Sequence, residues 1–455
     1  MAGEWREIPF SQAVQLNPPV QLSRGVTYPF VDMTAVTPGS RSAFASEQRE
    51  FAGGGSRFAV GDTLMARITP CLENGKIVRF AGQPGELAHG STEFIVIRGR
   101  DGVSESDYAY YLTKWEGVSG YAISQMTGTS GRQRVPTEAF DHLEVPLPPL
   151  SEQRAIAYIL GTLDDKIELN RRMNETLEQM ARALFKSWFV DFDPVRAKAA
   201  VRRQHPKWTN EQVSTAACPN LNPEIAALFP DAFEKSELGE IPKGWRVGTL
   251  GDVLAELVSG ARPKGESVEN GIPSIGAENV IGLGRYDFSK EKFVPNEFFE
   301  QLKSKGANVR ARDILLYKDG AQIGRKTFFD RGFPHNKCAV NEHVFILRCR
   351  NPLMQRYLFF WLDLPWVTNE IVALNSNSAQ PGINQAGVRR LPVMQPGDEL
   401  IEAFDCIVSP FIDMLFNRCH ESRTLAALRD ALLPKLISGE IRVKDAERFL
   451  KERGL

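Results

Sequence analysis

The most regular pattern of apolar and polar positions begins directly after a proline-rich stretch, "PLPPL" at residues 146–150, and no proline follows until Pro194. From Ile156 onward the apolar positions recur at alternating spacings of four and three residues, which is typical of the seam of a heptad repeat. The pattern predicts one long helix over residues 151–190. Its seam consists of Ile156, Leu160, Leu163, Ile167, Asn170, Asn174, Leu177, Ala181, Leu184 and Trp188.

A second seam with the same spacing lies 248 residues further along the chain and predicts another helix over residues 398–439. Ser151 and Asp398 stand where N-caps belong, and Gly439 suits a helix terminus. At about 1.5 Å per residue, each helix would be roughly 55 Å long. The second seam consists of Phe404, Val408, Phe411, Leu415, Arg418, Ser422, Leu425, Arg429, Leu432 and Leu436.

Both seams become polar in the middle, at Asn170 and Asn174 in the first and at Arg418 and Ser422 in the second. A helix with one apolar stripe needs a partner, and the simplest partner is the other helix. In an antiparallel pair the two polar layers would face each other and set the register at some cost in stability. The alternative is that each helix packs only on its own globular domain.

The rest of the chain repeats with a similar long period. "WREIPFSQAVQL" from Trp5 is answered by "WRVGTLGDVLAEL" from Trp245, and "GDTLMARITP" is answered by "RDILLYKDGA", which places Asp62 opposite Asp313. From Val135, opposite Ile383, the offset settles at 248. An ordered set of matches favours an internal duplication over two unrelated α+β domains.

The predicted fold class is therefore α+β, with two pseudo-repeated α/β lobes separated by the two long antiparallel coiled-coil helices. The first lobe spans residues 1–150 and the second spans residues 239–397. A linker or appendage of unknown role spans residues 191–238, with 196–234 longer than a simple linker needs, and a C-terminal tail spans residues 440–455.

Composition limits the function classes. A chain with 42% hydrophobic and 24% charged residues is typical of a soluble globular protein, and neither a bilayer-spanning run nor a signal peptide stands out. The six scattered cysteines form no CxxC pair, which favours reduced thiols and a cytoplasmic location. Residues 1–150 hold 13 Lys and Arg against 16 Asp and Glu, whereas residues 239–397 hold 21 against 16. Any nucleic acid must therefore be bound by local basic loops.

Two lobes on a rigid spacer suit a ligand with two half-sites, and DNA is the common ligand of that kind. Base edges are read by Arg, Lys, Asn or Gln side chains, so polar, glycine-flanked loops are the candidates; the alternative is that they are solvated turns. Four segments at matching places in the repeat carry the predicted DNA contacts: Arg67, Thr69, Asn74 and Lys76; Thr129, Ser130, Arg132, Gln133 and Arg134; Lys318, Gln322, Arg325 and Lys326; and Asn375, Asn377, Ser378, Gln380 and Asn384.

Three segments carry a resemblance to a known family. "PLPPLSEQRAIAYILGTLDDKIELNRRMNETLEQMARALFKSWFVDFDPV" at residues 146–195, "SELGEIPKGWRVGTLGDV" at 236–253 and "LLPKLISGEI" at 432–441 resemble the specificity subunits of type I restriction–modification systems. The second helix departs from the pattern, with "PGDELIE" where the first has "PPLSEQR".

The resemblance implies a non-catalytic subunit with two target-recognition domains on a bipartite double-stranded DNA target. It implies two modification subunits as partners, which would carry S-adenosylmethionine and methylate adenine. Restriction subunits that use ATP and Mg²⁺ would be further partners, and no cofactor is expected on this chain. Arg171, Arg172, Arg182 and Lys186, off the seam, could receive partner helices, although a solvated face is the default for such charges.

The chain itself carries no convincing catalytic motif. Asn17-Pro18-Pro19 is followed by Val20 instead of the aromatic residue that amino-methyltransferases use, so we interpret it as a turn. The six histidines have no metal-ligand spacing. Two alternatives remain open from the sequence: a two-lobed adaptor that binds proteins, and a single-chain modification methyltransferase.

Overall fold

The computed structural model describes residues 4–129, 131–263, 268–375 and 382–451, and the chain divides into two compact units. Unit 1 joins residues 1–169 to residues 422–455, and unit 2 is the continuous stretch 170–421. Each unit contains one lobe and one half of each long helix, and each is described by itself below. Within the described ranges, no helix combines the length and the apolar character that crossing a bilayer requires.

The lobe of unit 1 is built on mixed sheets with two helices packed against them. A five-stranded sheet has the order β2-β10-β7-β8-β4, a four-stranded sheet has the order β5-β3-β9-β6, and β1 pairs with β11. The elements are β1 (Arg6–Pro9), α1 (Phe10–Ala13), β2 (Val14–Leu16), β3 (Thr27–Val31), β4 (Ser42–Ala43), β5 (Glu47–Glu50), β6 (Ser56–Ala59), β7 (Thr63–Ala66), β8 (Ile77–Phe80), β9 (Leu87–Gly90), β10 (Phe94–Gly99), α2 (Ser106–Lys114), α3 (Glu116–Ser124), η1 (Thr137–His142) and β11 (Glu144–Leu147).

The lobe of unit 2 follows the same plan. Its sheets have the orders β15-β21-β18-β19 and β17-β16-β20, and β14 pairs with β22. The elements are β14 (Arg246–Thr249), α8 (Leu250–Val253), β15 (Leu254–Ser259), β16 (Ile272–Ile275), η2 (Ala277–Asn279), η3 (Phe288–Lys290), β17 (Phe293–Val294), α9 (Asn296–Ser304), β18 (Ile314–Tyr317), β19 (Lys326–Phe328), β20 (Ala339–Val340), β21 (Val344–Cys349), α10 (Met354–Leu362), α11 (Pro365–Ala373), α12 (Gln385–Arg390) and β22 (Pro392–Gln395).

Contacts at equivalent positions establish the duplication. Asp62 accepts a bidentate pair of hydrogen bonds from Arg98, both at 2.6 Å, and Asp313 accepts the same pair from Arg348, both at 2.7 Å. The parallel pairing of β3 with β9 is repeated by β16 with β20. The predicted fold class, two repeated α/β lobes with two long helices, is confirmed.

The long helices are α4 (Leu150–Phe189) and α13 (Asp398–Ile437), each of 40 residues. The predicted N-caps are wrong, because Ser151 and Asp398 both already lie within their helices. Ser151 already lies in the first turn of α4, where the Pro149 carbonyl accepts from Glu152 N and Gln153 N, and Asp398 is the first residue of α13. Gly439 has a φ of +75°, the left-handed conformation that follows a helix end.

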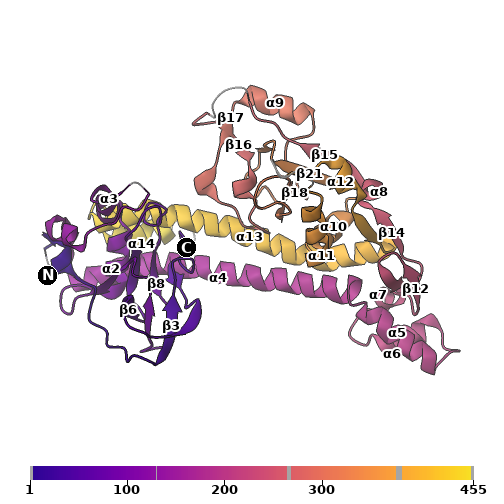
Figure 1. The fold of residues 1–455 in the computed structure, drawn as a ribbon, viewed down its shortest axis with the longest axis horizontal. Coiled ribbons are helices and arrows are strands. Elements are labelled where there is room, and N and C mark those ends of the chain that lie inside the picture. The colour runs from indigo at the N-terminus through magenta and orange to yellow at the C-terminus, as the bar shows by residue number, and fades with distance from the viewer. Residues whose placement is uncertain (1–3, 130, 264–267, 376–381, 452–455) are drawn as a thin grey trace. The chain divides into compact units, whose positions relative to one another are not determined.

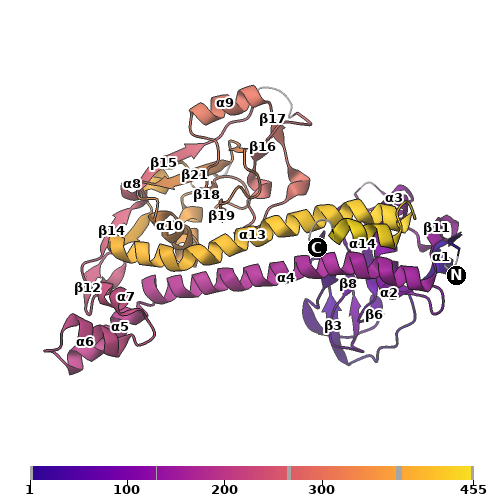
Figure 2. The same ribbon diagram turned by 180° about the vertical axis from the view of Figure 1, so that it is seen from behind.

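Within each unit, a segment of α4 lies beside an antiparallel segment of α13 (Figures 1 and 2). In unit 2, Asn170 and Asn174 contact residues near position 420, whereas Phe185 packs edge-on against Phe404 at 5.7 Å. In unit 1, the Asp164 carboxylate lies 2.6 Å from the Arg429 guanidinium. The alternative in which each helix packs only on its own lobe is therefore wrong.

The central polar layer of unit 2 contains both asparagines of α4. Asn170 Nδ2 donates to Glu421 Oε2 at 2.8 Å, and Asn174 Nδ2 donates to Cys419 Sγ at 3.5 Å. Arg418 donates to the Met414 carbonyl of its own helix at 3.4 Å. The predicted facing of the two polar layers, with Arg418 and Ser422 opposite the asparagines, stays a prediction.

The stretch between the lobes folds into a helical appendage of unit 2. It consists of α5 (Asp193–Gln204), α6 (Asn210–Ala217), α7 (Pro223–Leu228) and a hairpin of β12 (Phe233–Ser236) with β13 (Gly239–Pro242). Its centre is Lys198, which is fully buried and donates to Asn210 Oδ1 and to the carbonyls of Ala226 and Phe229.

The C-terminal tail, for which the sequence predicted no element, contains α14 (Val443–Lys451). It follows Arg442, whose guanidinium lies 5.1 Å from the ring centre of Trp5 and donates to Glu152 at 3.1 Å. Glu152 also accepts from the Trp5 indole at 2.9 Å. The two ends of the described chain thus meet inside unit 1.

Candidate nucleic-acid interface

The two predicted DNA-contacting segments of the first lobe lie side by side. The main chain joins them, because Val135 N donates to the Arg67 carbonyl at 2.8 Å and Thr69 N donates to the Gln133 carbonyl at 3.0 Å. Thr69 Oγ1 also accepts from Gln133 N at 3.1 Å. Residues that are more than 60 positions apart in the sequence therefore form one polar surface.

The charged side chains on this surface differ in how firmly they are held. Arg134 forms a bidentate ion pair with Glu93, at 2.6 to 3.1 Å, and this hydrogen bonding raises the pKa of the guanidinium. Lys76 Nζ donates to the Met33 carbonyl at 2.6 Å. The side chains of Asn74, Thr129 and Arg132 are exposed, and Ser130 lies outside the described residues.

The corresponding segments of the second lobe are joined in the same way. Ile383 N donates to the Lys318 carbonyl at 2.8 Å, the counterpart of the bond from Val135 to Arg67. Lys318 N in turn donates to the His343 carbonyl, as Arg67 N does to that of Glu93. The two lobes thus present matching pairs of loops, with different side chains on the same backbone frame.

Several predicted contacts of the second lobe have structural partners. Lys326 is buried, donates to Thr368 Oγ1 at 2.9 Å and to Asp363 at 3.3 Å, and its pKa is lowered by burial. Asn384 caps α12 through Gly387 N, and Asn375 Oδ1 accepts from Gly382 N, both at 2.8 Å.

The remaining candidates of this lobe divide into two groups. Gln322 and Arg325 are exposed, and the Lys318 ammonium lies 5.0 Å from the ring centre of Phe345. Asn377, Ser378 and Gln380 lie outside the described residues. All the individual base contacts stay predictions.

Residues that the sequence analysis missed lie beside these loops. His343 Nδ1 is 2.6 Å from Asp319 Oδ1, and its Nε2 is 3.2 Å from Arg262. His343 occupies the place in the second lobe that Glu93 has in the first, next to the loop backbone. The repeat alignment was the signal that could have found this position, because no motif surrounds it.

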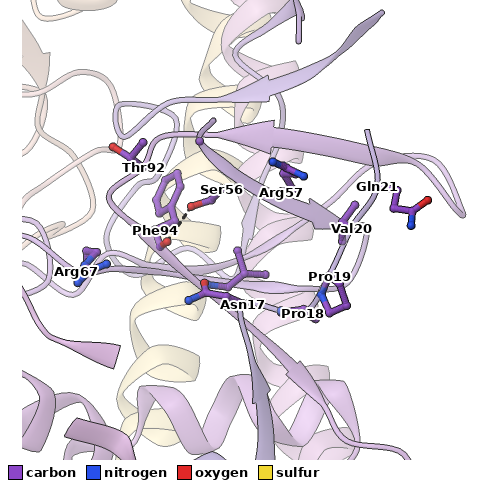
Figure 3. Close-up of a pocket in the computed structure, with 12 residues that line it drawn as sticks. Asn17, Pro18, Pro19, Val20, Gln21, Ser56, Arg57, Arg67, Thr92 and Phe94 are labelled. Atoms are coloured by element: carbon purple, nitrogen blue, oxygen red, sulfur yellow. Dashed lines mark hydrogen bonds between the residues drawn. The ribbon is translucent and has the colours of Figure 1, made fainter. Parts of the chain in front are cut away.

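Asn17-Pro18-Pro19 forms a turn, as expected, and this turn lines a pocket of about 500 Å³ in the first lobe (Figure 3). Asn17 has a φ of +46° and is fixed twice to one residue: its N–H donates to the Val96 carbonyl at 2.7 Å, and its Oδ1 accepts from Val96 N at 3.0 Å. Arg57 and Arg67 are among the other residues that line the pocket.

Comparison with known proteins identifies the family to which the chain belongs. Residues 27–179 match the type I restriction modification DNA specificity domain. The chain is 33% identical over 452 residues to the EcoEI specificity subunit of Escherichia coli, an alignment that covers 86% of this chain and 75% of that one. The chain belongs to the family of type I restriction enzyme specificity subunits.

Further matches include two specificity subunits and one solved structure. The MjaIX specificity subunit of Methanocaldococcus jannaschii is 28% identical, with 76% of this chain and 71% of that one covered. The HindI specificity subunit of Haemophilus influenzae is 27% identical, with 84% and 86% covered. The crystal structure of the S subunit from M. genitalium overlays with a TM-score of 0.48 at 15% identity and covers 95% of this chain and 96% of that one.

This specificity subunit is therefore a DNA-sequence-recognition component of a multi-subunit type I restriction–modification complex and is not itself an enzyme. Among the residues that the structure describes, no group of three or more His, Cys, Asp or Glu side chains is placed to hold a metal ion.

Proposed function

We propose that the specificity subunit reads a bipartite DNA sequence, with one half of the sequence recognised by each lobe. The matched loops support this most strongly, because the same backbone bond joins Val135 to Arg67 in the first lobe and Ile383 to Lys318 in the second. Two lobes that have the same loop backbone but different side chains suit two half-sites that differ in sequence. Arg132 and Gln133 in one lobe, and Gln322 and Arg325 in the other, are the foremost candidates for base contacts.

We further propose that the chain positions two adenine methyltransferase subunits, and in some assemblies a restriction subunit, on that DNA. A duplicated chain offers two equivalent attachment surfaces, as a symmetric dimer would. In this arrangement S-adenosylmethionine is bound by the methyltransferase subunits, and ATP and Mg²⁺ by the restriction subunit. The chain then contributes recognition and geometry without a cofactor of its own.

Exchange of one lobe tests the proposal. Replacement of residues 1–150 by the first lobe of another family member, in cells that also carry the partner genes, is expected to change one half of the methylated sequence and leave the other half unchanged. Methylome sequencing measures both halves at once. A change in both halves would contradict the assignment of one half-site to each lobe.

The two alternatives make different predictions. A single-chain methyltransferase would bind S-adenosylmethionine without partners, which calorimetry on the isolated chain detects. An adaptor for proteins alone would leave duplex DNA unbound at low salt, where phosphate contacts give their strongest binding. We expect neither result.

A further inference from the structure

The charged residues that line the pocket in the first lobe are all positive. Among the described residues that line it, Arg57 and Arg67 carry positive charge and none carries a carboxylate. In the view of Figure 3 the two arginines lie on opposite sides of Ser56 and Phe94. The lobe as a whole is acidic, so this concentration of positive charge is local.

The polar groups that face the pocket are donors with little competition inside the protein. Arg67 Nη2 donates to the Val135 carbonyl at 2.8 Å, but its Nε is buried and has no partner. Asn17 uses its Oδ1 on Val96 N, which leaves its amide N–H groups as the part that a ligand can bind. Ser56 Oγ is occupied as a donor to the Phe94 carbonyl at 2.8 Å.

Arg57 is the second cationic donor. It is exposed on β6, its guanidinium lies 5.2 Å from the ring centre of Phe51, and it has no ion pair within the described part of the chain. Thr92 adds an exposed hydroxyl at the rim. A ligand for this pocket needs acceptors and negative charge to match the two guanidinium groups and the Asn17 amide N–H groups. Phosphodiester oxygens meet that description, whereas the acceptors on nucleobase edges, such as O6 and N7 of guanine, carry no formal charge.

The pocket adjoins the predicted reading surface through Arg67. The peptide of this residue bonds to Glu93 on one side and to Val135 on the other, and Val135 follows the loop that carries Gln133 closely in sequence. A backbone phosphate in the pocket would therefore lie next to the bases that those side chains face. Contacts of this kind fix the register of a protein on a duplex without reading its sequence.

We propose that this pocket binds the phosphodiester backbone of the target DNA, with Arg57 and Arg67 as its phosphate ligands. The inference rests on the proposed DNA recognition and assigns Arg67 to positioning instead of base reading. In the first lobe, the pocket then binds the backbone of one DNA strand, and the loops at 69–74 and 129–134 contact the bases.

The test measures DNA binding by the full-length chain, in complex with any partners that copurify, as a function of salt. Arg57→Gln leaves the main-chain bonds intact and is expected to weaken binding to cognate and random duplexes by the same factor. It should lower the slope of log affinity against log salt by about 0.9, the value for one lost phosphate contact on B-DNA. Arg57→Gln combined with Arg67→Gln should lower the slope by about 1.8. Neither change should alter the methylated sequence.

Three comparisons make the result decisive. Arg57→Lys keeps the charge and should keep the slope, and Arg6→Gln removes an exposed arginine of β1 outside the pocket and should leave binding unchanged. Arg57→Gln with an unchanged slope, in a preparation whose unmodified chain binds DNA, would overturn the phosphate site and leave the proposed function intact. An altered methylated sequence would overturn it as well, because the pocket would then read bases. Absence of DNA binding by the unmodified complex would refute the proposed function itself.

Discussion

The two lobes are attached to the long helices by different chemistry at equivalent positions. In unit 1, Asp164 of α4 accepts from Tyr111 Oη at 2.8 Å and from Arg429 of α13 at 2.6 Å, and all three groups are buried. In unit 2, the residues at the corresponding places of the repeat are Ile412, Phe360 and Ala181, and all three are buried and apolar. One junction is held by a buried ion pair and the other by an aromatic core.

The same arrangement of the backbone can therefore be stabilised either by a buried ion pair or by apolar packing. Around Phe360 the second junction gathers Phe185, Phe189, Tyr357 and Phe404, with ring centres 4.9 to 6.2 Å apart. Apolar burial of this kind is stabilising and leaves no charge that needs a partner. A buried ion pair gains little net stability, but it is costly to break, because the remaining charge has no partner.

The largest expected effect is the loss of one side of the ion pair in unit 1. Asp164→Ala removes the buried partner of Arg429 and leaves it only the exposed Asp430, at 2.7 Å, so it should destabilise unit 1 by about 3–5 kcal/mol. Burial lowers the pKa of Arg429, but the Asp164 and Asp430 carboxylates together outweigh this effect and raise that pKa. Hydrogen exchange followed by mass spectrometry should show faster exchange in residues 150–169 and 422–437, and unchanged exchange in both would contradict the assignment.

A comparable loss is expected in unit 2 from the removal of an aromatic ring. Phe185 is 2% exposed and contacts four other rings, so Phe185→Ala should cost about 3–5 kcal/mol through lost burial and a residual cavity. Urea unfolding followed by tryptophan fluorescence measures it. Met180→Ala, at an exposed position of the same helix, is the matched control and should change the stability little.

A smaller effect is expected when the first junction is rebuilt on the pattern of the second. The triple variant Asp164→Ile, Arg429→Ala, Tyr111→Phe replaces the whole polar cluster by its apolar counterparts. Such replacements are neutral or stabilising by about 1–4 kcal/mol when no charge is left behind. The midpoint of thermal unfolding should therefore stay level or rise, and a fall as large as that of Asp164→Ala would show that the two junctions are not interchangeable.

The smallest effect concerns the ion pairs at the surface of each junction. Arg41 meets Asp165 of α4 at 2.6 Å, and Arg331 meets Asp413, 248 residues later on α13, at 2.5 Å. The hydrogen bond from Arg331 lowers the pKa of Asp413. A carboxylate with a lowered pKa in the folded state stabilises above its unfolded pKa, and this contribution is lost as the pH falls through the folded value.

Asp413→Asn should therefore cost about 0.2–1 kcal/mol at pH 7 and less at pH 3, where the unmodified carboxylate is also becoming protonated. Urea unfolding at both pH values measures the difference. An equal cost at pH 7 and pH 3 would show that the charge of Asp413 does not contribute.

The sequence predicted the elements that depend on local periodicity. Both long helices, the antiparallel pairing of their segments and the duplicated lobes follow from spacing that one chain displays by itself. The individual partners of Asn170 and Asn174, Glu421 and Cys419, did not follow from spacing, because a heptad pattern identifies the seam and not the rotamer of each side chain.

The candidate site shows the same division. The repeat identified which loops meet, but polar residues on a glycine-rich loop have the same composition whether they face solvent or support the fold. Lys326 is buried and pairs with Asp363, a residue that only the fold brings near it. Asn384 caps a helix through Gly387 N, a role that its sequence context alone did not distinguish from exposure on a loop. Arg57 was missed because its strand carries no motif and only the pocket gives it significance.

The meeting of Trp5 with Arg442 and Glu152 has a consequence for biosynthesis. Unit 2 is one uninterrupted stretch, so all of its residues are synthesised before residues 422–455 of unit 1. Unit 1 combines residues 1–169 with residues 422–455, so its first segment cannot complete its fold until that later segment has been made. Synthesis of unit 1 therefore begins before that of unit 2 and continues after it.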